Sequence, residues 1–273
     1  MANRAPKKYR DILSDSYDGP LYKYRSAVAK FDKGKELYNE YTERIITTQS
    51  LFYQDPRKFN DPFEFAPYVE PMSRQALKKM LASRGVPKSE RPIAIDRHFK
   101  STKQFQDHLR TNLNQAIDYS HYGVCCFSKK WDIIQMWSYY ADDHKGICFG
   151  FHTNYDTGLE KNRFWIKEVS YKMERPSYTL GPNSTNWDFL VTKEYKWEHE
   201  QEVRGIDTEM TSAVSRNRRY NKEDLKELIF GCAATQQTID HYSNLLTEHG
   251  FDHVKLKRAI KNNRYYKLDI EDL

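Results

Sequence analysis

The stretches Gly123-Val-Cys-Cys-Phe-Ser128 and Gly146-Ile-Cys-Phe-Gly-Phe151 decide the class of fold. Each is a short and nearly continuous apolar run, which is the pattern of a strand buried on both of its faces. Only a central sheet buries such runs, so we expect both stretches in one shared sheet. The residues from Trp131 to Ala141, which lie between them, suit a helix with one apolar side.

Further short strands and helices extend outward from this centre. We predict strands at Leu21–Arg25, Ser50–Gln54, Phe164–Tyr171, Glu200–Ile206, Leu228–Gly231, Val254–Leu256 and Tyr265–Ile270. We predict helices at about 34–44, 186–196 and 235–249. Regular strand–helix alternation is absent, so the pattern predicts an α+β fold with a mixed, largely antiparallel sheet.

The organisation of the chain favours one domain. Residues 1–20 are polar and end in the turn signal Asp18-Gly-Pro20, so we interpret them as an N-terminal arm. No repeat or low-complexity linker divides residues 21–273. Residues of about 65–121 are expected to form a helical insertion, because Phe105, Leu109, Leu113 and Ile117 recur every four residues behind a capping box at Ser101–Gln104.

Composition excludes several classes of protein. The 273 residues carry 44 Lys and Arg against 38 Asp and Glu, and 14% of them are aromatic, which excludes an intrinsically disordered chain. No window approaches the ~18 apolar residues of a membrane span, and the start has no apolar leader region. We therefore expect a cytoplasmic protein with no membrane partner. The four cysteines lack a paired spacing, so neither a zinc site nor a disulfide framework is expected.

Common catalytic motifs are missing from the sequence. There is no phosphate loop, no dinucleotide-binding glycine pattern, no zinc-protease motif and no serine-hydrolase elbow. With 11 glycines in 273 residues, a glycine-cradled nucleotide site is hard to build. These absences remove most kinases, dehydrogenases and serine hydrolases from consideration.

The densest group of chemical side chains is Glu200-Gln-Glu-Val-Arg204. On a strand, the two-residue period places Glu200, Glu202 and Arg204 on one face. Two such carboxylates can divide the work of orienting a hydroxyl and stabilising positive charge, and an arginine beside them keeps both ionised. A solvated edge strand that carries ion pairs explains the same pattern. No metal ligand set is predicted in the favoured interpretation.

Other candidate residues lie on the predicted strands and on the central helix. Ser128 ends a buried strand and could bind a ribose or cap the following helix. Trp137 and Tyr140 could stack on a planar ring or belong to the core. Arg25 ends the first strand and is suited to phosphate, although a surface ion pair explains it equally well.

Taken in order, the motifs of the chain resemble a bacterial family catalogued as domain of unknown function 2971. The motifs are Leu21-Tyr-Lys-Tyr-Arg25, Phe59-Asn-Asp-Pro-Phe-Glu64, Cys126-Phe-Ser128, Met136-Trp137, His144-Lys-Gly-Ile147, Lys193 with Trp197, and Glu200-Gln-Glu-Val-Arg204. The resemblance covers about residues 20–270. The family usually has His where this chain has Tyr139, so that position holds no indispensable histidine.

A more distant similarity is to the ADP-ribosyltransferase superfamily, whose split sheet holds NAD without a glycine-rich loop. This resemblance implies that Arg25, or else Tyr22 or Tyr24, contacts the phosphates or a ribose of NAD. It implies that Ser128 supports the nicotinamide ribose. Glu200 or Glu202 would then bind the ribose 2′-hydroxyl and stabilise the oxocarbenium-like transition state.

The resemblance further implies a stacking residue and a biological setting. Tyr139 or Tyr140, with Trp137 beside them, would stack on nicotinamide. The setting would be a bacterial toxin or antiphage defence effector, with a restraining partner protein.

We therefore expect an enzyme that cleaves NAD as a substrate and modifies a nucleic-acid or protein acceptor. One alternative is a metal-dependent nuclease in which Asp61, Glu64, Glu200 and Glu202 gather Mg²⁺. The other is a non-catalytic nucleic-acid-binding or regulatory module that uses the basic clusters and exposed aromatic side chains.

Overall fold

The computed structural model divides the chain into two compact units. Unit 1 comprises Met1–Lys58, Ser120–Val169 and Lys196–Leu273, and unit 2 comprises Phe59–Tyr119 and Ser170–Tyr195. The structure describes residues 17–32, 35–69, 73–100, 119–152, 164–178, 188–210 and 215–273. Most of the predicted N-terminal arm, the capping box at Ser101 and the apolar stripe from Phe105 to Ile117 lie outside the described residues.

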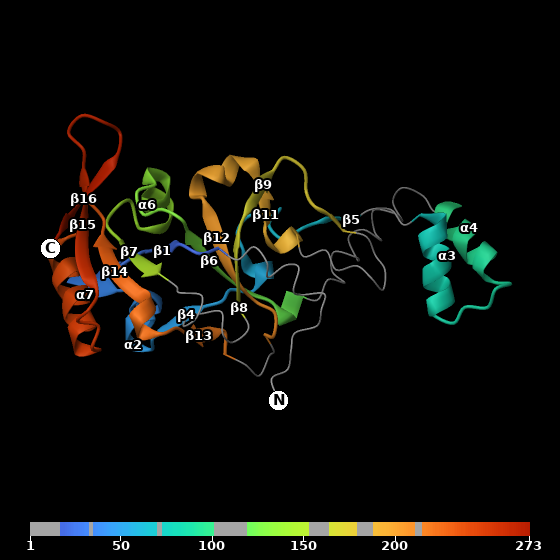
Figure 1. Ribbon diagram of the computed structural model, residues 1–273, viewed down its shortest axis with the longest axis horizontal. Helices are drawn as coiled ribbons and strands as arrows, with labels where there is room; N and C mark the ends of the chain where they lie inside the picture. Colours follow the sequence, from blue (N-terminus) through green and yellow to red (C-terminus); the bar gives the residue numbers. More distant parts are fainter. Residues whose placement is uncertain are drawn as a thin grey trace. The chain divides into compact units, whose positions relative to one another are not determined.

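Unit 1 is built on one eight-stranded sheet (Figure 1). In chain order its strands are β1 (Pro20–Arg25), β6 (Gly123–Ser128), β7 (Ile147–His152), β8 (Phe164–Glu168), β12 (Glu202–Asp207), β14 (Leu225–Phe230), β15 (Lys255–Lys261) and β16 (Leu268–Asp272). Their spatial order is β16-β15-β14-β7-β1-β6-β12-β8, and every neighbouring pair is antiparallel except β14 with β15. The predicted α+β class with a mixed, largely antiparallel sheet is confirmed.

The two apolar stretches that predicted the sheet form β6 and β7, and nearly every residue of both strands is buried. They are not direct neighbours, because the N-terminal strand β1 lies between them. Six residues of β1 are in register with β7, whereas a single pair, Tyr22 with Ser128, joins β1 to β6.

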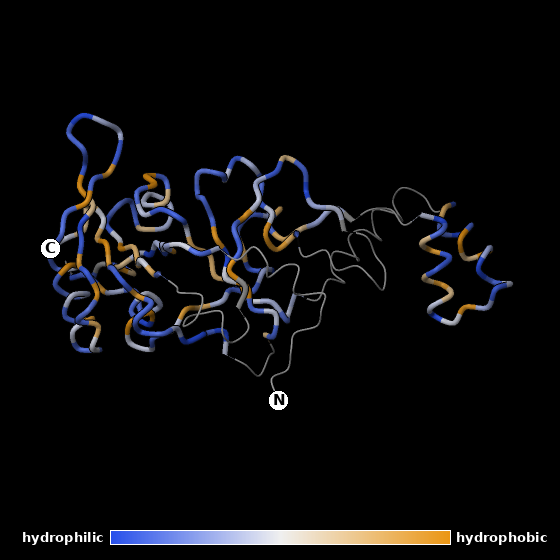
Figure 2. Tube along the Cα trace, in the orientation of Figure 1, coloured by the Kyte–Doolittle hydropathy of each residue, from blue (hydrophilic) through white to orange (hydrophobic). Residues whose placement is uncertain are grey.

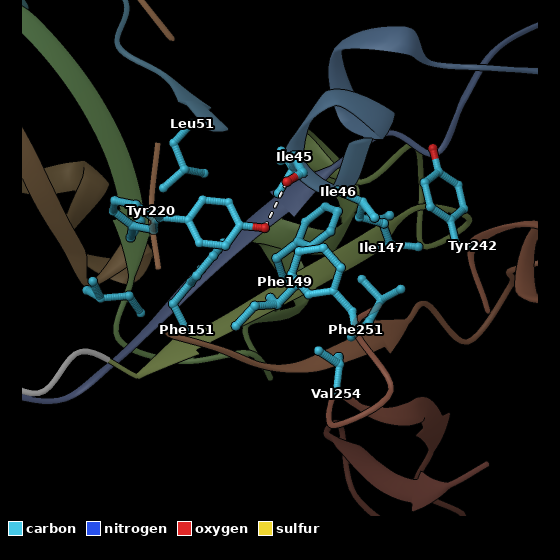
Figure 3. Packing of buried hydrophobic residues seen from close by; sticks show 14 of the residues in the cluster. Ile45, Ile46, Leu51, Ile147, Phe149, Phe151, Tyr220, Tyr242, Phe251 and Val254 are labelled. Atoms are coloured by element: carbon cyan, nitrogen blue, oxygen red, sulfur yellow. Dashed lines mark hydrogen bonds between the residues drawn. The ribbon is translucent and has the colours of Figure 1, made fainter. Parts of the chain in front are cut away.

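One face of this sheet carries the larger hydrophobic core, against helices α2 (Glu40–Thr47) and α7 (Gln236–Glu248) (Figure 3). Phe149 and Phe151 of β7 lie here, together with Ile45 and Ile46 of α2. Buried Tyr220 donates from its hydroxyl to the carbonyl oxygen of Ile45 at 2.8 Å. The helices begin where side chains cap them, Asn39 for α2 and Thr235 for α7.

The opposite face of the sheet is covered by helix α6 (Ile134–Tyr140). A second hydrophobic cluster forms there, in which the fully buried Trp137 meets Tyr24 edge to face at 5.2 Å between ring centroids. Along the chain of unit 1, apolar stretches alternate with polar ones, as the hydropathy colours show (Figure 2).

Smaller elements complete unit 1. Two further antiparallel pairs are β2 (Val28–Asp32) with β3 (Lys35–Tyr38), and β4 (Ser50–Phe52) with β13 (Asn217–Arg219). Short 3₁₀ helices are η1 (Pro56–Lys58) and η5 (Lys222–Asp224). The helix predicted at about 34–44 is wrong in its first half, because residues 35–38 pair with β2 and the cap at Asn39 starts the helix at Glu40.

The described part of unit 2 contains helices α3 (Arg74–Ser83) and α4 (Arg91–Lys100), which pack through Leu77 and Ile95. It also contains two short parallel pairs, β5 (Tyr68–Val69) with β10 (Ser177–Tyr178), and β9 (Ser170–Lys172) with β11 (Thr192–Glu194). The 3₁₀ helix η3 (Asp188–Leu190) precedes β11, and η4 (Tyr195–Glu200) follows it. The helix predicted at 186–196 is therefore wrong.

Two short segments adjoin strands of the large sheet, one before β6 and one after β8. The 3₁₀ helix η2 (Tyr119–His121) leads into β6. The strand predicted at Phe164–Tyr171 ends at Glu168, and residues 170–172 pair with β11 instead of continuing along β12. Within the described ranges of the chain, no helix has the length and apolar character needed to cross a membrane.

Candidate active site

A row of polar side chains crosses the α6 face of the sheet. Tyr22 of β1 is in register with Ser128 of β6, and Ser128 is in register with Glu202 of β12. On the other side of β1, Tyr22 is opposite Gly150, which is opposite Glu227 of β14. Residues in direct register on adjacent strands point to the same face. We call Tyr22, Ser128, Glu202 and Glu227 the polar row.

Glycine at position 150 lets the two halves of this row meet. A Cβ at this position would lie 2.4 Å from Cγ of Glu227. Without that methyl group, Glu227 reaches over β7 to the Tyr22 hydroxyl. Burial, together with the charge of Glu227 and its hydrogen bond, raises the pKa of Tyr22, so this phenol stays protonated at neutral pH. Glu227 also forms an ion pair with Lys257 at 2.6 Å.

The polar row crosses the sheet between β1 and β6, which share fewer registered residue pairs than any other two neighbouring strands of this sheet. Beyond the Tyr22–Ser128 pair, side chains of β1 donate hydrogen bonds to backbone carbonyl groups in and just after β6. Nζ of Lys23 donates to the carbonyl oxygen of Cys126 at 3.0 Å, and the Tyr24 hydroxyl donates to the carbonyl oxygen of Lys130 at 2.8 Å. One registered pair therefore joins the two parts of the eight-stranded sheet at this point.

Glu202 is held by a buried ion pair. Nε of Arg204 lies 2.8 Å from one carboxylate oxygen, and a terminal nitrogen lies 3.1 Å from the other. The exposed fraction is 4% for the Glu202 side chain and 0% for Arg204. Cys126 lies beside this pair, and burial with the charge of Glu202 raises the pKa of its thiol. The thiol is therefore neutral and is no nucleophile here.

Glu200 is placed differently from its prediction. It ends the 3₁₀ helix η4, and β12 starts only at Glu202. The cause is Gln201, whose φ of 45° turns the chain out of strand geometry. The same-face argument thus fails for Glu200 as a strand residue. Its carboxylate is nevertheless buried near the row, where Oε1 accepts a hydrogen bond from the Tyr140 hydroxyl at 2.8 Å.

Ser128 connects Glu200 to the polar row. Its side chain is fully buried, and Oγ donates to the carbonyl oxygen of Glu200 at 2.7 Å while accepting from the amide of Lys130 at 3.2 Å. Ser128 is not the cap of the following helix, because the N-cap residue of α6 is Ile133. It fixes the position of η4 against β6.

The aromatic candidates divide into core and surface. Trp137 is fully buried and donates from its ring nitrogen to the carbonyl oxygen of Trp131 at 2.7 Å, and Tyr24 packs against it. Both therefore belong to the core in this structure. Tyr140 is 40% exposed and also touches Glu200, so it extends from the buried carboxylate to the solvent. Tyr139 is exposed.

Arg25 does not join the other candidates. Alternation along β1 places it with Leu21 on the face of the larger core, opposite Tyr22 and Tyr24. Burial lowers the pKa of its guanidinium, and Nε is buried without a hydrogen-bond partner among the described residues. Arg25 therefore does not lie on the face that carries Ser128, and Tyr22 occupies the first-strand position of the row.

The carboxylates of the nuclease alternative have other contacts. Within unit 2, Glu64 lies 3.6 Å from Nζ of Lys193, and both side chains are nearly buried. Asp61 accepts from the amide of Phe63 at 2.8 Å. The described parts of the chain contain no cluster of three or more His, Cys, Asp or Glu residues suited to a metal ion.

The sequence reasoning missed Glu227 and Cys126 as parts of this site. A signal for Glu227 was available, because a glycine inside a strand pattern, such as Gly150, marks a close approach by another group. Nothing in the sequence alone placed Cys126 beside Glu202, since that requires the register of β6 with β12.

A family model matches a stretch of the chain that carries part of this site. Residues 136–205 match the family described as "Protein of unknown function (DUF2971)". The matched segment runs from helix α6 through β12, so it contains both glutamates and Arg204. This supports the resemblance to that family. No curated protein and no solved structure matches the chain, so nothing in the comparisons supports the ADP-ribosyltransferase resemblance.

Proposed function

We propose that unit 1 is an ADP-ribosyltransferase-like enzyme that cleaves NAD at the polar row. The observation that supports this most directly is the alignment of Tyr22, Ser128 and Glu202 on three neighbouring strands, at the point where β1 and β6 share one registered pair. The resemblance implies a first-strand side chain and a carboxylate for binding NAD, which Tyr22 and Glu202 supply, and Ser128 lies between them as a positioning residue.

The chemistry needs negative charge beside a developing cation. When the bond between ribose and nicotinamide breaks, positive charge spreads over the ribose ring, and a fixed carboxylate stabilises it. Glu200 and Glu202 are the buried carboxylates available, and each is already oriented by a partner, Tyr140 for Glu200 and Arg204 for Glu202. Such preorganisation avoids reorientation during the reaction.

Tyr140 gives this site a route to solvent. Because it is half-exposed and bound to Glu200, rotation of its ring would uncover the carboxylate and leave an aromatic face for nicotinamide. In this proposal Ser128 is a positioning residue that holds η4, since its Oγ is already bonded to the backbone of Glu200.

The test is nicotinamide release from NAD by the purified chain, followed by liquid chromatography. Glu200→Gln and Glu202→Gln are compared with Glu198→Gln, a matched variant of an exposed neighbouring glutamate. We expect a loss of ~100-fold or more at whichever glutamate faces the developing cation, because one aligned electrostatic group contributes ~3 kcal/mol. Glu198→Gln should retain full activity.

Labelled NAD with separate nucleic-acid and protein pools identifies the acceptor in the same experiment. Full turnover in both the Glu200 and Glu202 variants contradicts the proposal. Mg²⁺-dependent cleavage of nucleic acid without nicotinamide release favours the nuclease, and binding without any turnover favours the non-catalytic module.

A further inference from the structure

The β15–β16 hairpin ends in a tip, Lys261–Lys267, that leaves the body of unit 1 (Figure 1). Strand β14 pairs with β15 only as far as Arg258, so beyond that residue the hairpin is a two-stranded ribbon. Ala259 and Leu268 still pack into the cluster under α6. The residues between Lys261 and Leu268 pack against no hydrophobic cluster among the described residues.

The tip exposes two aromatic rings that the fold does not need. Tyr266 is fully exposed, at 103% of its reference area, and Tyr265 is 59% exposed. Exposed aromatic side chains lose the burial that normally stabilises them, and adjacent pairs on a projecting loop are typical of binding surfaces.

The backbone of the tip is nevertheless ordered by its own hydrogen bonds. Oδ1 of Asn262 accepts from the amides of Arg264 at 2.9 Å and Tyr265 at 2.7 Å. The side-chain nitrogen of Asn262 donates to the carboxylate of Asp269 at 2.6 Å. The backbone amide of Asn262 donates to the carbonyl oxygen of Lys267 at 3.1 Å, which closes the turn. The tyrosines are thus presented by a preorganised loop, which lowers the entropy cost of binding.

The charge of the tip is positive. Lys261, Arg264 and Lys267 all carry exposed cationic groups, and residues 261–267 contain no acidic residue. The guanidinium of Arg264 lies 5.2 Å from the ring centroid of Tyr265, and Lys267 forms a half-exposed pair with Asp269 at 2.7 Å. The hydropathy tube draws the loop in blue with a paler stretch and without the orange of apolar residues (Figure 2).

We propose that this tip is a docking site for single-stranded nucleic acid, with Tyr265 and Tyr266 stacking on bases and Lys261, Arg264 and Lys267 binding phosphates. Aromatic faces interleaved with cations are the arrangement that binds single strands without sequence preference. The proposal goes beyond NAD cleavage and does not depend on it.

Fluorescence anisotropy of a labelled single strand of ~20 nucleotides tests the proposal, because that length exceeds the ~4–16 nucleotides of one binding site. RNA and DNA of the same sequence are measured with the full chain. We expect Tyr265→Ala with Tyr266→Ala to weaken binding at least about 10-fold. Lys261→Gln with Arg264→Gln should also reduce the slope of log affinity against log salt by about 1.4, because each phosphate contact on a single strand contributes about 0.7.

The chain offers a matched control on helix α2. Tyr41 is 63% exposed, and the guanidinium of Arg44 lies 5.4 Å from its ring centroid, which closely resembles the Arg264–Tyr265 contact. Tyr41→Ala and Arg44→Gln should leave affinity unchanged. Because the tip residues are exposed, their variants should also keep the wild-type melting temperature.

Unchanged affinity in the tip variants overturns the proposal. It is also overturned if the tip binds vesicles of equal phosphatidylcholine and phosphatidylserine but neither nucleic acid, which would make it a membrane contact. Nicotinamide release without an acceptor is measured on the same variants and should not change. A failure of the docking proposal is thereby separated from a failure of the NAD proposal.

Discussion

Arg204 donates hydrogen bonds to both carboxylate oxygens of Glu202, two residues earlier on the same strand, with nitrogen–oxygen distances of 2.8 and 3.1 Å. Both side chains are buried. Alternation of the strand places both side chains on the face that carries Ser128 and Tyr22. Removing one member of a charged pair at this depth destabilises the fold, because the other charge stays buried and loses that partner.

Loss of Glu202 should therefore cost stability as well as activity. We expect Glu202→Gln to lower the free energy of unfolding by about 3 kcal/mol, because Arg204 stays buried and loses the charge of Glu202. Urea denaturation of Glu202→Gln measures this loss. In a cycle of Glu202→Met, Arg204→Met and the double variant of these two changes, the double variant should be more stable than the sum of the single losses indicates. Additive losses would show that the two side chains do not interact.

Removal of the Ser128 hydroxyl should loosen η4. Ser128→Ala leaves the carbonyl oxygen of Glu200 without this donor, and we expect a loss of about 1–2 kcal/mol in the free energy of unfolding. Since the serine only positions Glu200, kcat for nicotinamide release should fall more than KM rises. Ser128→Cys, which keeps a weak donor, should recover part of the activity. An unchanged melting temperature together with weaker NAD binding would instead indicate direct contact with the ribose.

The hydroxyl of Tyr140 should matter where that of Tyr139 does not. Tyr140→Phe removes the donor to Oε1 of Glu200, so we expect a loss of about 1 kcal/mol in stability and a lower kcat. Tyr139→Phe removes a hydroxyl from an exposed ring and is the matched control. Thermal unfolding and nicotinamide release are measured for both. Equal effects of the two changes would contradict the role given to Tyr140.

His144 should make the stability of the protein fall in mild acid. Burial lowers the pKa of its imidazole, with Lys261 acting in the same direction and Asp143 opposing it. The folded state therefore binds this proton less readily than the unfolded state. The contribution is fully present above the ordinary histidine pKa of about 6.5 and is lost as the pH falls through the lower folded value.

The measurement for His144 is the urea midpoint at several pH values between neutrality and mild acid. Its Nδ1 is buried without a hydrogen-bond partner in the described part of the chain, and its Nε2 lies 3.2 Å from Oγ of Ser138. His144→Gln should flatten the acid side of the profile. His249→Gln, a change at the C-terminus of α7, is the control and should leave the profile as in the wild type.

The sequence predicted the centre of the sheet well, because buried strands carry continuous apolar runs such as those at Gly123–Ser128 and Ile147–His152. It could not predict Glu200 correctly. A left-handed residue is usually glycine or asparagine, and Gln201 gives no such signal in the sequence. The 3₁₀ helix before it is held by tertiary contacts, among them the bond from Ser128.

Alternation along β1 already separates Tyr24 from Arg25 in the sequence. What the sequence did not reveal was which of the two shares a face with Ser128, since this follows from the register of Tyr22 with Ser128. Strand pairing between residues about a hundred positions apart is fixed by the packing of the whole sheet. The same limit hid Glu227 and Cys126.

The position of the first strand has a consequence for how the protein is made. During translation β1 is synthesised long before β6 and β7, yet it lies between them in the folded sheet. Strand pairs so far apart in the sequence form slowly, because the entropy of closing the long loop is lost before the new contacts stabilise the chain. A nascent chain ending before Gly123 therefore exposes β1 with neither neighbour, and we expect that fragment to depend on chaperones until His152 has emerged.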